Sequence, residues 1–379
     1  MIPYGRQSIV DDDIQAVINV LQSDFLTQGP AVPQFEQAVA KSVGASFAVA
    51  MNSATSALHV ACLALKLGPG DTLWTVPNTF VASANCALYC GAKIDFIDIN
   101  SRTWNMSIDA LEERLIQARK KNALPKIVVP VHFAGQPTDQ QAIRALSDEY
   151  GFKIIEDASH SIGASRDGES VGSCRWSDVT IFSFHPVKII TSGEGGMALT
   201  NDRSLATLMS MLRTHGITRD AALFKDAAAG AFHYEQQMLG FNYRMTDLHA
   251  ALGASQMQRL EIYVERRNVL AQRYDAALKD LPLELPFVDS RNCSAFHLYV
   301  TRMARDRDLV FAELRSRGVG VNVHYTPVHL QPYYRDIGFG PGLCPEAEAH
   351  GREALTLPLY PTLTECQQDE VIQLLMEML

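Results

Sequence analysis

Residues 179–200 read VTIFSFHPVKIITSGEGGMALT, in which two apolar runs flank a polar loop that contains a lysine. VTIF and GGMALT are short apolar runs, which predicts two buried strands. Lys188 lies just beyond the first strand, among Phe184, Pro186, Val187 and two isoleucines. Such surroundings lower the pKa of a lysine by desolvation, as a lysine nucleophile requires. A solvated surface charge is a poor explanation of this lysine.

The regions before this stretch alternate in the same way between apolar runs and helical patterns. The apolar runs are FAVAMN, DTLWTVP, KIDFIDI, KIVVPVHF and FKIIEDA, and polar stretches such as TDQQAIRALSDEYG separate several of them. Near-continuous apolar strands that alternate with helices predict an α/β fold with a mostly parallel sheet covered on both faces. The first helix of the series is expected to end at Gly68-Pro69-Gly70.

The regions before and after this alternating part of the sequence have mainly helical patterns. DDDIQAVINVLQSD and PQFEQAVAKSV predict two helices near the N-terminus, and one or two long helices are expected after Thr246. HLYVTRM, GVGVNVHY and a closing helix then indicate a smaller α+β unit. We therefore expect a large domain with an N-terminal arm over residues 1–246 and a smaller C-terminal domain over residues 247–379.

Composition excludes several classes of protein. The formal net charge of −9 and the lack of a Lys/Arg run argue against nucleic acid or an anionic membrane as a partner. No segment reads as a membrane span, and the first residues lack the pattern of a signal peptide. The seven cysteines form no CxxC pair, and Cys86 and Cys90 are expected to be small buried residues rather than metal ligands. A reducing cytoplasm and a site without metal are the expectation.

Polar residues follow four of the predicted elements, where ligands bind in an open parallel sheet. Asn52–Ser56 opens a helix and predicts either an anion site or an ordinary helix cap. Asp157 ends a strand with His160 nearby, and a carboxylate there needs a partner such as a protonated ring nitrogen. Ser183 precedes Lys188 and offers a hydroxyl to a phosphate. The fourth segment, GFNYRMTD at 240–247, alone indicates only a helix start.

Together, NSATSAL, EDASH, SFHPVK with GEGG, and GFNYRMTD resemble the DegT/DnrJ/EryC1/StrS sugar aminotransferases over essentially the whole chain. The resemblance implies a fold-type I enzyme dependent on pyridoxal 5′-phosphate (PLP), with a seven-stranded type of sheet. It implies that Lys188 binds PLP as a Schiff base and moves the catalytic proton. It also implies that Asp157 pairs with the pyridine nitrogen and that His160 faces the 3-oxygen of the ring. The other implied cofactor contacts are Phe80 stacking on the ring, with core packing as its alternative, and Ala54, Thr55, Ser183 and Asn242 at the phosphate.

Asn242 would reach the phosphate of the neighbouring subunit, so the resemblance implies a homodimer with shared sites. SFHPVK and VHYTPVHLQPYY further resemble the branch that serves pseudaminic acid biosynthesis. That branch transfers an amino group from L-glutamate to C4 of UDP-2-acetamido-2,6-dideoxy-β-L-arabino-hex-4-ulose. His185 is expected either to face the sugar or to act as a rigid spacer. The implied sugar-nucleotide contacts are Tyr4, Asp24, Phe25, Leu26, Thr27, Ala54, His185, Val323, His324, Tyr325 and Thr326.

Other functions stay open or are disfavoured. Another nucleotide-linked 3- or 4-keto-6-deoxy sugar is an alternative substrate. A sugar 3-dehydratase would carry histidine at Lys188, and a cysteine desulfurase would want a cysteine on a mobile loop. A non-catalytic regulator of this fold usually carries a DNA-binding module, and no basic recognition helix is present. An NAD enzyme is disfavoured because no GxGxxG follows a strand. Ser159 stands where many relatives of this family carry alanine beneath the cofactor ring, and a serine fits there sterically.

Overall fold

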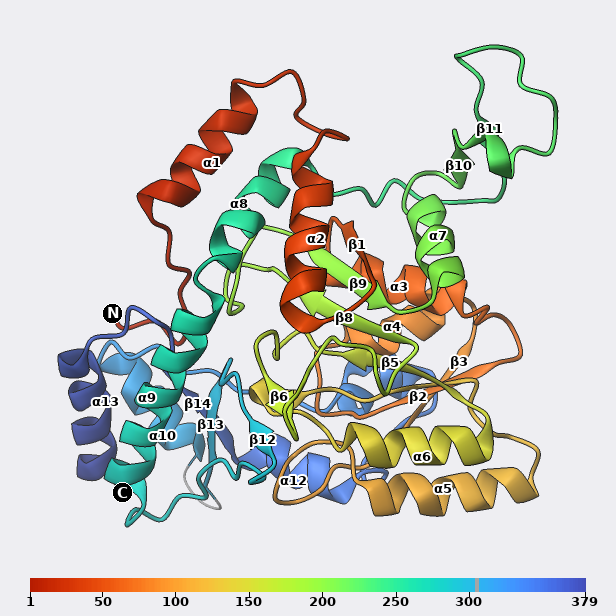
Figure 1. Cartoon of the computed structure of the whole chain (residues 1–379). Coiled ribbons are helices and arrows are strands. Elements are labelled where there is room, and N and C mark those ends of the chain that lie inside the picture. Colours follow the sequence, from red (N-terminus) through yellow and green to blue (C-terminus); the bar gives the residue numbers. More distant parts are fainter. Residues whose placement is uncertain (304–306) are drawn as a thin grey trace.

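A seven-stranded sheet forms the centre of the computed structural model, which describes residues 1–303 and 307–379 (Figure 1). Its strand order is β1-β9-β8-β5-β4-β2-β3. The strands are β1 (Phe47–Met51), β2 (Thr72–Thr75), β3 (Lys93–Phe96), β4 (Ile127–Val129), β5 (Lys153–Asp157), β8 (Val179–Ser183) and β9 (Gly196–Thr200).

Only β9 runs against the other strands of this sheet. It pairs antiparallel with β1 on one side and with β8 on the other, while β8, β5, β4, β2 and β3 pair in parallel. The predicted strands and the mostly parallel sheet are therefore confirmed. The chain between β8 and β9 forms a hairpin loop, and this loop carries Lys188.

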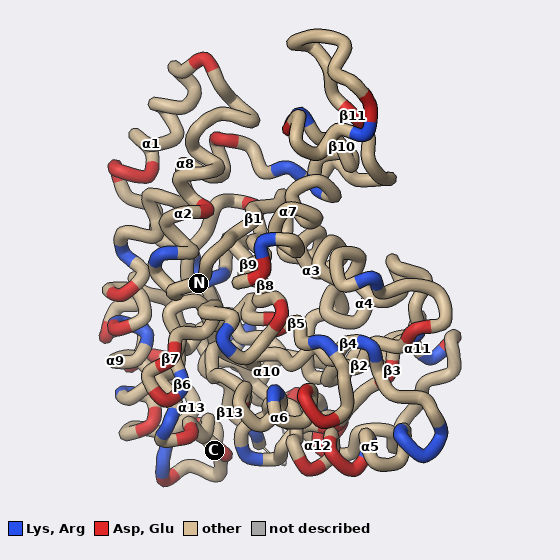
Figure 2. The backbone as a smooth tube through the Cα atoms, turned by 45° about the vertical axis from the view of Figure 1, so that its right-hand side comes forward, with Lys and Arg blue, Asp and Glu red and all other residues tan. Residues whose placement is uncertain are grey.

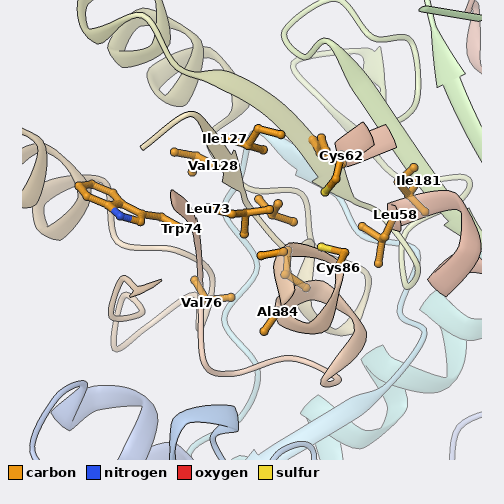
Figure 3. Close-up of a cluster of buried hydrophobic side chains, with 14 of the residues drawn as sticks. Leu58, Cys62, Leu73, Trp74, Val76, Ala84, Cys86, Ile127, Val128 and Ile181 are labelled. Carbon is orange, nitrogen blue, oxygen red and sulfur yellow. The ribbon is translucent and has the colours of Figure 1, made fainter. Parts of the chain in front are cut away.

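Helices cover both faces of the sheet, as the near-continuous apolar strands require. In β8, Ile181 packs into one hydrophobic cluster and Phe182 into another, since successive side chains of a strand point to opposite faces. The larger cluster includes Leu58, Cys62 and Cys86 from two neighbouring helices (Figure 3). Cys86 and Cys90 are both buried among apolar side chains, as the sequence predicts. The helices before residue 213 are α1 (Asp11–Leu21), α2 (Ala31–Val43), α3 (Ala54–Ala64), α4 (Ala82–Tyr89), α5 (Ile108–Lys120), η1 (Phe133–Gly135), α6 (Gln140–Tyr150) and α7 (Arg203–Leu212).

Helix α3 ends earlier than the glycines after it suggest. Its last residue is Ala64, and Lys66 takes a left-handed conformation with φ of 61°. The N–H of Leu67 then donates to the carbonyl of Cys62 at 2.9 Å and closes the helix. The expected end at Gly68-Pro69-Gly70 is therefore wrong by a turn, because a lysine adopts the conformation that glycine usually supplies.

The chain after α7 combines small sheets with helices. The segment after Thr246 forms two helices rather than one, and α8 packs on α1 and α2. HLYVTRM contains a strand, β13, and GVGVNVHY forms isolated bridges, Ile2 with Val319 and Asn322 with Thr356. The remaining elements are β6 (Ser165–Arg166), β7 (Glu169–Ser170), β10 (Ile217–Thr218), η2 (Ala221–Leu223), β11 (Glu235–Gln236), α8 (Asp247–Met257), α9 (Leu260–Leu278), β12 (Asn292–Cys293), β13 (Tyr299–Arg302), α10 (Arg307–Ser316), η3 (Val328–Leu330), α11 (Pro332–Asp336), α12 (Pro345–Glu353), β14 (Ala354–Leu357) and α13 (Glu365–Met378).

A third hydrophobic cluster joins α9, α10 and α13 to the β13–β14 pair, and it includes Ile2. The N–H of Ile2 donates to the carbonyl of Gly318 at 2.8 Å, so the first residues pack on the C-terminal part of the chain. The division into domains after residue 246 stays a prediction.

Candidate active site

A cavity of about 680 Å³ opens where β5 and β8 end. Its wall combines residues from the N-terminal segment, the start of α3, the loop before α4 and the segment after α10. Eleven of the residues expected in the site line it: Tyr4, Ala54, Thr55, Phe80, Asp157, His160, Ser183, His185, Lys188, His324 and Tyr325.

Lys188 lies in the loop between β8 and β9, which backbone hydrogen bonds hold closed. The N–H of Phe184 donates to the carbonyl of Gly195, and that of Ser192 donates to the carbonyl of Phe184, both at 2.9 Å. Burial lowers the pKa of Lys188 to about 8, although the nearby carboxylate of Asp157 acts in the opposite direction. The amine therefore loses its proton far more readily than an exposed lysine, as nucleophilic chemistry requires.

Asp157 is the last residue of β5 and is held by two serine hydroxyls. Ser83 donates to its Oδ2 at 2.5 Å, and the hydroxyl of Ser159 donates to Oδ1 at 2.6 Å. The hydroxyl of Thr79 lies 2.8 Å from that of Ser83 and extends the network. These hydrogen bonds orient the carboxylate at the cavity wall. Sequence reasoning missed Ser83, whose only signal was its position three residues after Phe80.

The start of α3 forms the opposite side of the cavity. Ser53 caps the helix by accepting a hydrogen bond from the N–H of Ser56 at 3.1 Å, so the prediction of a helix cap is confirmed. Ala54 and Thr55, in the first turn, line the cavity near Ser183. A helix start with a neighbouring hydroxyl favours an anion. Gly196, the first residue of β9, allows this strand to lie against the start of α3, because a Cβ at this position would lie 2.3 Å from the nitrogen of Ala54.

His160 is enclosed by other rings and stays neutral. Burial lowers its pKa well below 6.5, and Lys188 and His324 add to the effect. The N–H of Ala134 donates to Nδ1 of His160 at 3.3 Å. The ring of His297 lies 4.5 Å from that of His160, and His297 also lines the cavity. Sequence reasoning missed His297, together with Asn322 in the same wall.

His324 and Tyr325 line the far wall of the cavity, next to Tyr4. Nδ1 of His324 lies 2.8 Å from the hydroxyl of Thr356, and burial lowers the pKa of His324 to about 3. The ring centroids of Tyr4 and His324 are 5.7 Å apart. These side chains are thus held in place by neighbours on β14 and the N-terminal segment.

The other expected residues lie outside the cavity wall of this chain. Val323 and Thr326 lie on either side of the wall residues His324 and Tyr325, and Thr326 is exposed. Asn242 is exposed, and so is the loop Asp24, Phe25, Leu26 and Thr27. A bridge between Thr27 and Thr246 places these two segments side by side.

The side chains around the cavity fit PLP. This cofactor uses a lysine of low pKa, a carboxylate fixed by two hydroxyls and an anion-binding helix start. The ring of Phe80 is exposed at the cavity, so core packing, the alternative for this residue, is wrong. Fold and site together define a PLP-dependent enzyme of fold type I.

Comparison with known proteins agrees with this class. Residues 7–376 match the DegT/DnrJ/EryC1/StrS aminotransferase family, and the chain belongs to that family. It is 37% identical over 380 residues to the spore coat polysaccharide biosynthesis protein SpsC of Bacillus subtilis, covering 98% of this chain and 95% of SpsC. Helicobacter pylori PseC, an aminotransferase of pseudaminic acid biosynthesis, is 29% identical with a TM-score of 0.90, over 99% of this chain and 98% of PseC. DesV of S. venezuelae, solved with a ketimine intermediate, gives a TM-score of 0.87 at 29% identity, over 99% of this chain and 98% of DesV. The protein is a PLP-dependent sugar aminotransferase.

The described part of the chain offers neither a metal site nor a membrane span. Within residues 1–303 and 307–379, no three His, Cys, Asp or Glu side chains are grouped so that they could hold a metal ion. Within those same ranges, no helix combines the length and apolar character needed to cross a membrane.

Proposed function

We propose that this enzyme transfers an amino group from L-glutamate to C4 of UDP-2-acetamido-2,6-dideoxy-β-L-arabino-hex-4-ulose, a step of pseudaminic acid biosynthesis. The observation that carries the proposal is the convergence of Tyr4, His185, His324 and Tyr325 on the cavity that holds Lys188. These residues come from three distant segments, and they are the ones for which the sequence resembles the pseudaminic branch. Similarity to H. pylori PseC supports the same substrate.

Bound PLP supplies an electron sink for the carbon that exchanges its proton. Lys188 holds the cofactor and then moves the proton at C4 of the sugar from one face, which fixes the configuration of the new amine. Asp157 keeps the ring nitrogen protonated, and its two serine partners hold the carboxylate in that orientation. The start of α3 and Ser183 bind the phosphate. Fixing both reacting groups in one geometry contributes much of the rate.

We also propose that the enzyme is a cytoplasmic homodimer whose sites are shared between subunits. Phe25, Leu26 and Leu239 are exposed apolar side chains. Leu239 lies near Asn242, which is predicted to reach the partner, and a bridge between Thr27 and Thr246 brings the loop 24–27 beside that segment. In Figure 1 the β10–β11 hairpin, which lies in the same loop region as Asn242, extends away from the body of the protein. Exposed apolar side chains close to the expected partner contact, Asn242, support an interface there. The seven free cysteines support a reducing compartment.

A panel of UDP- and dTDP-linked keto-sugars, incubated with the enzyme, PLP and L-glutamate, tests the substrate. We expect mass spectrometry to show amine gain by the UDP-linked 4-keto sugar above all others, and NMR to place the amine at C4. Lys188→Ala is the control and should give no product. Preferential amination of a dTDP sugar, or at C3, would contradict the proposed substrate while leaving the enzyme class intact.

A second candidate substrate is another nucleotide-linked 3- or 4-keto-6-deoxy sugar. The observation that favours it is the 37% identity to SpsC, a protein of spore coat polysaccharide biosynthesis, against 29% to PseC. The same panel separates the two candidates.

A further inference from the structure

The hydroxyl of Tyr325 is connected to the backbone through His160. Nδ1 of His160 accepts a hydrogen bond from the N–H of Ala134. A neutral imidazole carries a single N–H, so the proton of His160 lies on Nε2. The lowered pKa of His160 agrees, because an imidazolium would direct a second N–H against that of Ala134.

Nε2 of His160 lies 3.2 Å from the hydroxyl oxygen of Tyr325. Since Nε2 carries the proton, His160 donates and Tyr325 accepts. The hydroxyl proton of Tyr325 must then be directed to a different acceptor. Tyr325 lines the cavity, so its hydroxyl is available to an oxygen atom bound there. Burial raises the pKa of Tyr325, with Asp157 and Tyr4 adding to the effect, so the hydroxyl stays protonated and acts as a donor.

The charged groups around His160 and Tyr325 indicate which bound oxygen atom accepts the hydrogen bond from Tyr325. Lys188 and His324 act on the pKa of His160, while Asp157 and Tyr4 act on that of Tyr325. The pair therefore lies within electrostatic reach of both the ring-nitrogen partner and the cofactor lysine. In PLP the 3-oxygen stands beside the carbon that joins the lysine, on the edge that leads round to the ring nitrogen.

We propose that Tyr325 donates the hydrogen bond to the 3-oxygen of PLP and that His160 is a positioning residue that orients this hydroxyl. The proposal rests on the proposed role of Lys188 as the cofactor anchor, and it reassigns the contact that the sequence resemblance gives to His160. A donor on the 3-oxygen withdraws electron density from it. The nitrogen of the lysine–cofactor Schiff base then holds its proton less tightly, and its pKa falls.

Absorbance titration of the holoenzyme without substrate measures this pKa directly. We expect Tyr325→Phe to raise the pKa of the Schiff-base nitrogen by roughly one unit, the size of a hydrogen bond to a charged group. Tyr334→Phe is the matched control, because Tyr334 is also buried but donates to Asn85. We expect the control to titrate like the wild type.

Two variants of His160 test the positioning role. His160→Gln keeps an N–H donor near Nε2 and should titrate close to the wild type. His160→Leu removes the donor and should raise the pKa in the same direction as Tyr325→Phe. This pair also decides the question if Tyr325→Phe fails to retain PLP.

The outcomes separate this inference from the proposed function. A wild-type protein that shows no borohydride-reducible Schiff base would overturn the role of Lys188. A normal Schiff base with the same pKa in the wild type, Tyr325→Phe and His160→Leu would overturn the inference alone. An unchanged pKa with a large loss of kcat/KM would assign the hydroxyl to the sugar instead, which also contradicts the inference.

Discussion

At the scale of single residues, the site depends on charges held away from water. The pKa of Lys188 falls from 10.5 to about 8 because the side chain is buried. The folded protein therefore binds the lysine proton less tightly than the unfolded chain does. This lowers the free energy of unfolding below pH 8, and the loss disappears as the pH rises from 8 toward 10.5.

Lys188→Met should for this reason stabilise the cofactor-free protein at pH 7. We expect a gain on the order of 1–2 kcal/mol, less than the pKa shift alone implies, since the cavity admits water. The gain should shrink above pH 8. Thermal unfolding of the cofactor-free proteins at several pH values measures it, with Lys41→Met on the exposed face of α2 as control. A gain that grows with pH contradicts the expectation.

The hydrogen bond from Ser83 to Asp157 should contribute to cofactor retention. We expect Ser83→Ala to weaken PLP binding about tenfold, because a hydrogen bond to a charged group is worth about 1.5 kcal/mol or more. Ser147→Ala is the matched control, since Ser147 is buried and donates to the carbonyl of Phe152 away from the cavity. Fluorescence titration with PLP compares them. Equal affinities would mean that Asp157 is oriented without Ser83.

At the scale of elements, the sequence predicts the central sheet well and its surroundings less well. Apolar runs such as those of β5 and β8 are typical of strands in a sheet that is covered on both faces. Their burial can therefore be predicted from the sequence. The end of α3 at Ala64 could not be predicted, because it depends on Lys66 taking the left-handed conformation that glycine more often supplies. Ser83 was missed because its partner Asp157 is distant in the sequence, and only the folded sheet brings them together.

The approach of β9 to the start of α3 should control phosphate binding. A Cβ on Gly196 would lie 2.3 Å from the nitrogen of Ala54, so Gly196→Ala must displace the first turn of the helix. We expect PLP affinity to fall at least tenfold, as the loss of one hydrogen bond to a charged phosphate implies. Gly68→Ala, beyond the other end of α3, meets no atom within 4 Å and is the control. Isothermal titration with PLP tests both, and equal affinities would contradict the expectation.

At the scale of the whole molecule, the proposed homodimer depends on the position of Asn242 relative to the cavity. Figure 2 shows acidic and basic residues interspersed along α9, whereas the charged residues of α1 are the three aspartates of its first turn. The sequence pointed to a shared site only by the resemblance of GFNYRMTD, and Asn242 lies outside the cavity wall of its own chain.

Mixed dimers test whether Asn242 acts across the interface. We expect Asn242→Ala alone to weaken PLP retention by about an order of magnitude through a lost phosphate hydrogen bond. Lys188→Ala alone should be inactive. A dimer that contains one subunit of each variant has one native site if the asparagine acts in the partner. Recovery of activity on mixing supports this arrangement, and the absence of recovery would place Asn242 in the site of its own chain.

The antiparallel strand β9 has a consequence for synthesis on the ribosome. β1 at residues 47–51 has β9 at residues 196–200 as its partner in the central sheet. At typical elongation rates of about 5–20 residues per second, the nascent β1 waits roughly 10 s before that partner exists. During this interval an apolar strand with an open edge is exposed to other nascent chains. The strand that closes the loop around Lys188 therefore also ends the period in which the growing chain most needs a chaperone.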